Sequence, residues 1–335
     1  MTGTPSVPGA IRHSRILGLG VYRPKRVVTS GELAPRLGLD EKWILKRSGV
    51  RNRGFASPEE TLTVMGEAAA GKALATAGLT STDVGCVIVA TTSHLTQMPS
   101  LASQIGYALG ADRAAAFDIL AACAGFPYAL ALASDMVRAG TASHVLAIGA
   151  ERSTDIVDPD DAGTAFLFAD GAGAVVVGPS DTPGIGPVVW GSDGSRADAV
   201  GMTGYWDPVL RTDPDLPWPR LGMQGWRVYR WATTELAPAI LRTIDAAGLT
   251  VADIDVFVPH QANMLIIDAL TEQLGFGDDV VIARDIENSG NTSSASIPLA
   301  LDHLMATGQV ESGMTALTVG FGSGMVYAGQ VIEIP

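Results

Sequence analysis

Residues 75–93 read ATAGLTSTDVGCVIVATTS, and residues 245–263 read DAAGLTVADIDVFVPHQAN. At an offset of 170 residues (245 − 75), both stretches contain Ala-Gly-Leu-Thr, an aspartate three residues later and then an apolar run. Two more pairs of similar segments keep the same order: 144–150 (HVLAIGA) with 315–321 (TALTVGF), and 171–178 (GAGAVVVG) with 322–329 (GSGMVYAG). Chance likeness of short Ala/Gly-rich segments is the alternative, but a repeat at about half the chain length predicts two similar halves.

Each half alternates predicted helices with predicted strands. Residues 84–90 and 256–259 are unbroken apolar runs, which is typical of strands buried on both faces of a parallel sheet. Further strands are predicted at 114–119 and 280–286. The predicted helices cover residues 65–77, 126–139, 228–247, 264–274 and 297–306. This alternation predicts an α/β fold with parallel strand pairing.

The repeat divides the chain into two halves with a segment between them. We expect an N-terminal half over 1–180, which holds Cys123, and a C-terminal half over 226–335, which holds the candidate histidine and asparagine. Residues 181–225 are rich in proline and tryptophan and are predicted to be an irregular excursion. Long segments of this kind usually form lids or interfaces.

Composition narrows the class of protein. Of 335 residues, 47% are apolar and 17% are charged, which suits a large packed core and excludes a disordered chain. The net charge of −13 disfavours binding to nucleic acid or to an anionic membrane surface. The N-terminal residues contain no apolar secretory segment, and two cysteines are too few for a disulfide framework. We therefore expect a cytoplasmic enzyme.

Cys123 is the first candidate for chemistry. It lies between a predicted strand, 114–119, and a predicted helix with Pro127 in its first turn. The free N–H groups and dipole at a helix N-terminus favour a thiolate, so the position suits a nucleophile. The alternative is a small buried thiol, which is how we interpret Cys86 in the middle of its apolar strand.

His260 and Asn291 follow predicted strands of the second half. His260 comes directly after 256–259. Asn291 precedes a Ser/Thr cluster that suits helix capping, and the alternative for Asn291 itself is a capping or turn asparagine. Polar groups at the carboxyl ends of strands converge on ligand sites. Thiol, imidazole and amide together suit either a hydrolase or an acyltransferase, and the physics of the residues leaves both open. The glycine-rich segment 321–325 offers a backbone oxyanion donor or, alternatively, a tight turn.

Three short motifs resemble the active-site motifs of the β-ketoacyl-acyl-carrier-protein synthase III family of the thiolase superfamily. They are AACAGF (121–126), HQAN (260–263) and GNTS (290–293). ERSTD (151–155), FADGAGAVVVGP (168–179) and GFGSGM (320–325) extend the resemblance over essentially the whole chain. It implies the thiolase-like fold, in which duplicated αβα halves stack in a five-layered αβαβα arrangement, and a homodimer.

The resemblance also implies a mechanism. Cys123 would attack an acyl-CoA thioester and keep the acyl group. His260 and Asn291 would hold the carbonyl oxygen of a malonyl thioester while CO₂ leaves, and the backbone N–H groups of Cys123 and Ser323 would form a second oxyanion hole. The CoA thioester is a substrate, and no metal or redox cofactor is implied.

Binding residues are implied in the same way. Arg230 matches a carrier-protein docking position, and Met98 matches a residue that enters the partner's acyl pocket. The substrate-binding positions implied are Trp43, Arg47, Met98, Asn263, Phe321 and Gly324. The chain departs from the family at Ala162 and Leu265, where an arginine is usual, and at Glu272-Gln273, where a basic pair is usual. These departures weaken the expected binding of CoA and of an acidic acyl carrier protein.

The leading hypothesis is therefore a decarboxylative condensing enzyme that primes fatty-acid or type II polyketide synthesis from an acyl-CoA starter and a malonyl group on acyl carrier protein. The second is an acyltransferase that loads Cys123 and passes the acyl group to an acceptor other than malonyl, with His260 as base. The third is a catalytically idle partner subunit, although a scaffold has no need of Cys123, His260 and Asn291 together.

Overall fold

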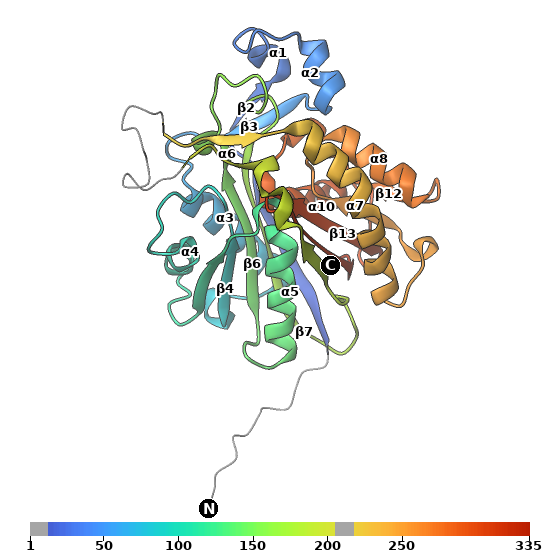
Figure 1. Ribbon diagram of the computed structural model, residues 1–335. Helices are drawn as coiled ribbons and strands as arrows, with labels where there is room; N and C mark the ends of the chain where they lie inside the picture. Colours follow the sequence, from blue (N-terminus) through green and yellow to red (C-terminus); the bar gives the residue numbers. More distant parts are fainter. Residues whose placement is uncertain (1–12, 205–217) are drawn as a thin grey trace, which may run out of the picture.

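Two five-stranded sheets form the centre of the molecule in the computed structural model, which describes residues 13–204 and 218–335 (Figure 1). The first sheet contains, in spatial order, β1 (His13–Tyr22), β7 (Asp170–Ser180), β6 (Val145–Arg152), β4 (Cys86–Ala90) and β5 (Ala115–Ile119). The second contains β8 (Val189–Ser192), β14 (Val326–Glu333), β13 (Thr315–Gly322), β11 (Val256–Pro259) and β12 (Val281–Ile282).

The two sheets have the same pairing pattern. In each, the first three strands pair antiparallel, and the third, fourth and fifth strands pair parallel. The repeated Ala-Gly-Leu-Thr segments also end alike, because Thr80 N–H donates to Asp83 Oδ2 and Thr250 N–H donates to Asp253 Oδ2, each at 2.8 Å. The predicted duplication is therefore confirmed.

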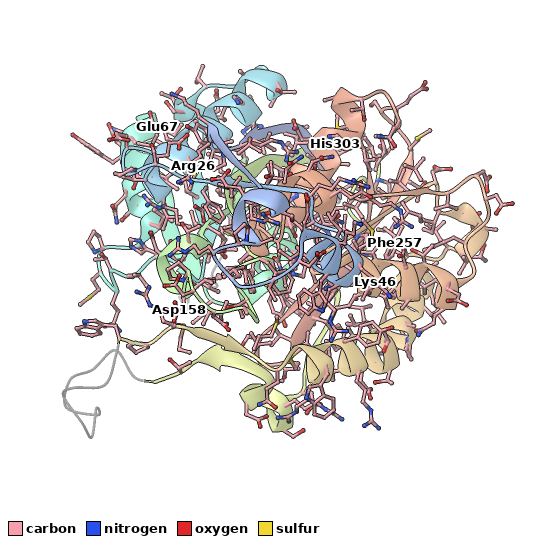
Figure 2. The ribbon with its side chains drawn as sticks, turned by 90° about the horizontal axis from the view of Figure 1, so that it is seen from above. Arg26, Lys46, Glu67, Asp158, Phe257 and His303 are labelled. Atoms are coloured by element: carbon pink, nitrogen blue, oxygen red, sulfur yellow. The ribbon has the colours of Figure 1, made fainter. Side chains whose placement is uncertain are left out.

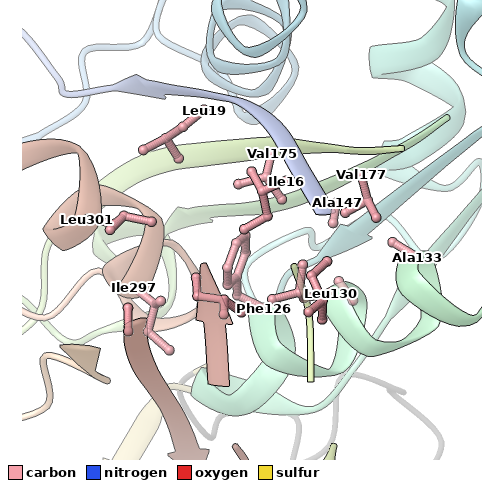
Figure 3. Close-up of a cluster of buried hydrophobic side chains, with 14 of the residues drawn as sticks. Ile16, Leu19, Phe126, Leu130, Ala133, Ala147, Val175, Val177, Ile297 and Leu301 are labelled. Atoms are coloured by element: carbon pink, nitrogen blue, oxygen red, sulfur yellow. The ribbon is translucent and has the colours of Figure 1, made fainter. Parts of the chain in front are cut away.

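Two helices lie between the sheets. They are α5 (Gly125–Arg138) and α10 (Ser296–Ala306). Their apolar side chains form one buried cluster with strands of both sheets, and Figure 3 shows Phe126 and Leu130 of α5 close to β1 and β7. Burial on both faces explains why the strands of each sheet read as continuous apolar runs.

Outer helices complete five layers. α3 (Leu62–Ala77) and α4 (Leu101–Leu109) cover the outer face of the first sheet, and α7 (Gly225–Ala246) and α8 (Met264–Leu274) cover that of the second. The αβαβα arrangement expected from the resemblance is confirmed. Within 13–204 and 218–335, no helix is long and apolar enough to cross a membrane.

A small layer covers one end of both halves. It contains β2 (Arg26–Thr29), α1 (Ser30–Leu33), α2 (Glu41–Ser48) and β3 (Asn52–Phe55), and α6 (Ser153–Ile156) and α9 (Ile286–Ser289) lie beneath it. Seen from above, its residues Arg26 and Lys46 lie across the top of the molecule (Figure 2). The layer packs on both halves, since β3 contacts β7 and α2 contacts α8.

Two segments differ in detail from the sequence prediction. The strand predicted over 280–286 is confined to Val281–Ile282, because the chain turns at Arg284 and Asp285 and Ile286 begins α9. The segment 181–225 contains β8, which joins the second sheet, and a ribbon of β9 (Val200–Met202) and β10 (Leu221–Met223). Its residues 205–217 lie outside those that the structure describes.

Gly20 permits close packing of β1 on α3 and gives a test of this interface. A Cβ at Gly20 would lie 2.3 Å from the carbonyl oxygen of Ala69 and 2.4 Å from the nitrogen of Ala73. We expect Gly20→Ala to lower the free energy of unfolding by about 1–3 kcal/mol, measured by urea denaturation. Gly71→Ala is the control, since its nearest neighbour is Leu109 at 3.9 Å, and we expect a gain of up to about 1 kcal/mol. Equal stability of Gly20→Ala and the parent would contradict the packing argument.

Candidate active site

Cys123, His260 and Asn291 line one cavity, which opens to solvent. Cys123 lies in a short 3₁₀ turn, Ala122–Ala124, that leads into α5. His260 follows β11 directly, and Asn291 lies between α9 and the 3₁₀ turn Ser293–Ala295 that leads into α10. The two central helices therefore bring residues from both halves to the same point.

The thiol of Cys123 is held in an apolar setting. Burial raises its pKa to about 12, with a smaller contribution from the negative charge of Glu151, although a hydrogen bond with the Ser293 side chain lowers it. Desolvation therefore opposes the thiolate that the start of α5 was expected to favour, because it outweighs the hydrogen bonds that lower the pKa.

His260 is kept as a neutral imidazole. Its side chain is 2% exposed, and burial lowers its pKa to about 3. Nδ1 lies 2.7 Å from Ser296 Oγ, and the ring packs edge-on against Phe321 with centroids 5.2 Å apart. Because Ser296 Oγ already accepts from the backbone N–H of Gln261, its own hydroxyl is suited to donate to Nδ1. That arrangement leaves the ring proton on Nε2, as a donor for a substrate oxygen.

Asn291 is held by its backbone and side chain. Its N–H donates to Leu167 O at 2.9 Å, and its Oδ1 accepts from Ser293 N–H at 2.9 Å. One Nδ2 proton points to the carbonyl oxygen of Ala262 at 3.4 Å. An amide has two such protons, so one remains for a ligand in the cavity that Asn291 and His260 share.

The end of β13 lies against the turn that carries Cys123. A Cβ at Gly322 would be 2.6 Å from the backbone nitrogen of Cys123, so only glycine fits here. The next residue, Ser323, lines the cavity, and its hydroxyl donates to the carbonyl oxygen of Val200 at 2.5 Å. The backbone of residues 322–323 is thereby held beside Cys123, where an oxyanion hole of two N–H groups is expected.

The excursion between the halves forms part of the cavity wall. Val200 of β9 and Met223 of β10 line the cavity, together with Val228 and Tyr229 of α7. From the sequence we predicted a lid or interface role for 181–225, and these contacts place its described part over the site. Which of its residues reach the cavity was not visible in the sequence pattern.

Of the other residues predicted to bind substrate, some line the cavity and some lie outside it. Asn263 and Phe321 line the cavity with the three central residues. Asn263 also caps α8 and donates from Nδ2 to the carbonyl oxygen of Arg47 at 3.1 Å, whereas the Arg47 side chain is exposed. Trp43 is 44% exposed and packs edge-on against Phe166, with ring centroids 5.5 Å apart.

Several predicted residues lie outside the cavity lining. Met98 is 80% exposed in the loop before α4, and Arg230 is exposed on α7. Gly324 has φ +137° and follows the lining residue Ser323 without lining the cavity itself. Ala162 and Leu265, the two departures from the family pattern, are both exposed.

Sequence reasoning assigned no part in the chemistry to Glu151, Ser293 or Ser296. Glu151 is fully buried and surrounded by hydroxyl and N–H donors, which include Ser293 Oγ at 3.0 Å. We interpreted the Ser/Thr cluster after Asn291 only as helix capping. A charged residue directly after the apolar run 144–150 was the signal that could have drawn attention to Glu151.

Comparison with known proteins gives a consistent result. The family model described as 3-oxoacyl-[acyl-carrier-protein (ACP)] synthase III matches residues 117–194, and the model of its C-terminal part matches 244–334. Beta-ketoacyl-[acyl-carrier-protein] synthase III 1 of Streptomyces coelicolor is 48% identical over 332 residues, covering 96% of this chain and 97% of that protein. The corresponding synthase III of Mycobacteroides abscessus is 46% identical over 336 residues, covering 100% and 98%.

Solved structures agree with the sequence matches. The crystal structure of the priming β-ketosynthase from the R1128 polyketide biosynthetic pathway has a TM-score of 0.97 and 47% identity over 99% of both chains. The 3-oxoacyl-[acyl-carrier-protein] synthase III of Aquifex aeolicus has a TM-score of 0.87 and 34% identity, covering 96% of this chain and 99% of that one. The similarity therefore extends over the whole chain in sequence and in fold.

The buried neutral His260 predicts a pH-dependent loss of stability. Its pKa is about 3 in the folded protein and near 6.5 when unfolded, so the unfolded chain binds the proton first as the pH falls. Between pH 7 and pH 5 this costs the folded state about 2 kcal/mol, and the loss continues toward pH 3. Urea unfolding of the parent and of His260→Gln at both pH values isolates this contribution, because the other titrating groups are common to both. An equal pH dependence of the two proteins would refute the prediction.

Proposed function

The chain belongs to the β-ketoacyl-acyl-carrier-protein synthase III family, and on that premise we propose that it primes fatty-acid or polyketide synthesis by condensing an acyl-CoA starter with malonyl-acyl carrier protein. It is an acyltransferase of the ketosynthase type. The observation that carries the proposal is the convergence of Cys123, His260 and Asn291 on one cavity between the two halves.

In the first step, the Cys123 sulfur attacks the carbonyl carbon of the acyl-CoA thioester. A new carbon–sulfur bond forms, the carbonyl oxygen becomes negative, and the bond to the CoA sulfur then breaks to leave acyl-Cys123 and CoA thiol. The N–H groups of Cys123 and Ser323 are the proposed donors to this oxyanion, and the close contact of Gly322 with Cys123 N supports the assignment. Removing one such donor typically costs about 3 kcal/mol of barrier.

In the second step, the malonyl thioester loses CO₂. The electron pair of the broken carbon–carbon bond passes into the thioester carbonyl, whose oxygen would accept hydrogen bonds from His260 Nε2 and Asn291 Nδ2. The enolate carbon then attacks the acyl-Cys123 carbonyl, which forms the β-ketoacyl product and releases the Cys123 sulfur.

The geometry favours condensation over the second candidate, acyl transfer to a non-malonyl acceptor. That reaction needs His260 as a base, but burial lowers the pKa of His260 to about 3, which makes the imidazole a weak base and leaves it as a donor. Base catalysis by His260 would leave Asn291 without a role. An enolate oxygen, in contrast, requires a second N–H donor beside His260.

We also propose that the condensation uses no metal or redox cofactor and takes place in the cytoplasm. The thiol, the imidazole, the amide and the backbone N–H groups account for each bond change without one. Among the described residues, no group of three or more metal-ligating side chains comes together. The scarcity of cysteine, two in 335 residues, suits a reducing compartment.

The edge of the first sheet supports the proposal of a homodimer. β5 is an edge strand with Phe117 partly exposed, and Leu120 just beyond it is 80% exposed. Leu95, Met98 and Tyr107 add exposed apolar side chains from the neighbouring loop and from α4. An exposed apolar edge of this kind favours pairing with a second copy. Met98 would then enter the partner's acyl pocket, as the resemblance implies.

The substrate carriers would approach across the small covering layer and α7. Trp43 is proposed to stack on the CoA adenine without the usual arginine opposite, since Ala162 stands there. Arg230 is the proposed docking cation for acyl carrier protein, but the exposed Leu265 and Glu272 replace other cations of the family. We therefore propose weaker electrostatic attraction of both carriers.

Two substitutions separate the two steps of the proposed reaction. Cys123→Ala removes acyl loading, because no sulfur remains to take the group. Asn291→Ala still loads acyl from acyl-CoA but loses condensation by about a hundredfold, since one donor to the enolate oxygen is gone. Intact-protein mass spectrometry measures loading, and product mass spectrometry with malonyl-loaded carrier protein measures condensation. Normal product formation by Asn291→Ala would exclude the condensation mechanism, and acyl-Cys123 without any carbon–carbon product in the parent would favour the second candidate.

The dimer proposal has a matched pair of variants. Leu120→Asp places a charge at the β5 edge, and we expect it to shift the protein from dimer to monomer in native mass spectrometry. Leu241→Asp makes the same change at a 45% exposed position on α7, and we expect a dimer. A monomeric parent protein would refute the homodimer, and a dimer that survives Leu120→Asp would place the interface elsewhere.

A further inference from the structure

Glu151 is a fully buried carboxylate at the end of β6, and no step of the proposed reaction uses it. Oε2 accepts from the loop after β4, with Ser93 Oγ at 2.6 Å, Thr92 N at 3.0 Å and Ser93 N at 3.1 Å. Oε1 accepts from the turn before α10, with Ser294 Oγ at 2.9 Å and Ser293 Oγ at 3.0 Å. Hydrogen bonds to a charged acceptor are stronger than those between neutral groups, so this carboxylate holds segments of both halves in place.

Ser293 connects this carboxylate to Asn291. Its hydroxyl donates to Glu151 Oε1, and its backbone N–H donates to Asn291 Oδ1 at 2.9 Å. Ser293 has φ +50°, a conformation that residues with a side chain rarely adopt and that persists only where the surrounding structure holds it. The hydrogen bond to Glu151 supplies such a hold, because it fixes the side chain of the residue whose N–H faces Asn291.

The side-chain amide of Asn291 has two possible orientations. Its oxygen and its NH₂ group are similar in size, and a half-turn about the Cβ–Cγ bond exchanges them. In the observed orientation Oδ1 accepts from Ser293 N–H, and Nδ2 points to the carbonyl oxygen of Ala262 at 3.4 Å. In the reverse orientation Oδ1 would face that carbonyl oxygen and the proposed enolate oxygen, which are both acceptors. Because the contact with Ala262 is long, the Ser293 N–H is the stronger of the two hydrogen bonds that set the orientation.

The backbone of Asn291 is held separately from its side chain. Its N–H donates to Leu167 O, and its carbonyl oxygen accepts from Ala169 N–H, each at 2.9 Å. Loss of the contact between Ser293 and Glu151 therefore leaves the Asn291 backbone in place and affects mainly the direction of its amide.

We propose that Glu151 is a positioning residue for the decarboxylation step, which acts through Ser293 to keep the Nδ2 group of Asn291 turned toward the enolate oxygen. Glu151 holds the Ser293 hydroxyl, and the Ser293 N–H holds Asn291 Oδ1, so the free N–H of the amide faces the substrate. Neither Glu151 nor Ser293 gains or loses a proton in this role. The inference rests on the proposed function, because that function assigns Asn291 as a donor to the enolate oxygen.

Ser293→Ala tests the connection, because it removes the hydroxyl that Glu151 holds and leaves the carboxylate with its other donors. Product mass spectrometry over a range of malonyl-carrier concentrations gives kcat and KM for condensation. We expect kcat to fall by about tenfold, which is less than the loss on removing the Asn291 donor outright. The KM and the rate of acyl loading should stay within about threefold of the parent's, since neither depends on the direction of the Asn291 amide. A variant that loads acyl slowly but condenses normally would place the role of Ser293 at Cys123 and overturn the proposal.

Ser294→Ala is the matched control. It removes a hydroxyl from the same oxygen of Glu151, but the other hydrogen bond of that hydroxyl runs to the carbonyl oxygen of Ala90 at 2.8 Å and not to Asn291. We expect its kcat for condensation to stay within about threefold of the parent's. Equal losses in Ser293→Ala and Ser294→Ala would overturn the proposal.

A double-mutant cycle separates positioning from a general structural role. If Ser293 acts by orienting Asn291, Ser293→Ala changes the residual condensation rate of Asn291→Ala by less than about twofold. If Ser293 supports the site in another way, the two losses multiply. A further loss of about tenfold in the double variant would therefore overturn the proposal.

Glu151→Gln tests the carboxylate itself. The backbone N–H groups of Thr92 and Ser93 need an acceptor, so the amide oxygen should face them and the amide NH₂ group should face the hydroxyls of Ser293 and Ser294. The Ser293 hydroxyl then pairs with a neutral group, and we expect kcat for condensation to fall by about threefold or more. In the Ser293→Ala background, the same substitution should change kcat by less than about twofold. An unchanged kcat in Glu151→Gln, or a multiplied loss in the double variant, would overturn the role of Glu151.

The parent protein tests the proposed function separately. A parent that makes no carbon–carbon product refutes condensation. A parent that makes the β-ketoacyl product while Ser293→Ala equals it in kcat refutes only the positioning role. If Glu151→Gln does not fold, the cycle of Ser293→Ala with Asn291→Ala still decides the proposal.

Discussion

The active site depends on two glycines that let the halves of the molecule approach each other at their backbones. Gly149 of β6 and Gly320 of β13 occupy the same position in the repeated segments 144–150 and 315–321. A Cβ at Gly149 would lie 2.4 Å from the carbonyl oxygen of Ser294, and one at Gly320 would lie 2.9 Å from Ala124 Cα. Each half therefore packs the turn before the other half's central helix against its own sheet, which brings the turns of Cys123 and Ser293 together.

This reciprocal packing also explains how one duplicated unit came to hold two kinds of chemistry. The turn before α5 carries a thiol, and the matching turn before α10 carries an amide and a run of hydroxyl groups. The strand ends differ in the same way, because β6 continues into the buried Glu151 whereas β13 continues into Phe321 and the oxyanion segment. The symmetry positions the groups, and the differences between the halves assign a nucleophile to one side and hydrogen-bond donors to the other.

The sequence predicted most of the features that the two halves share and few of the features that only one half has. Repeated segments and apolar runs predicted two α/β halves, and three short motifs predicted the residues that meet in the cavity. The desolvation that raises the pKa of Cys123 was not predicted, since it depends on side chains far away along the chain. Glu151 and Ser293 lie 142 residues apart, so no local pattern links them. The contribution of β9 and β10 to the cavity wall likewise depends on tertiary packing.

The electrostatics of the site follow from the desolvation of its side chains. A buried imidazole that stays neutral, such as that of His260, is a weak base, but its N–H group can donate a hydrogen bond to a substrate oxygen. The thiol of Cys123 resists ionisation for the same reason, because desolvation raises its pKa. A low-dielectric cavity also strengthens each hydrogen bond that a fixed N–H group donates to a developing negative charge. The site can thus stabilise two successive oxyanions, one beside the N–H groups of Cys123 and Ser323 and one beside His260 and Asn291.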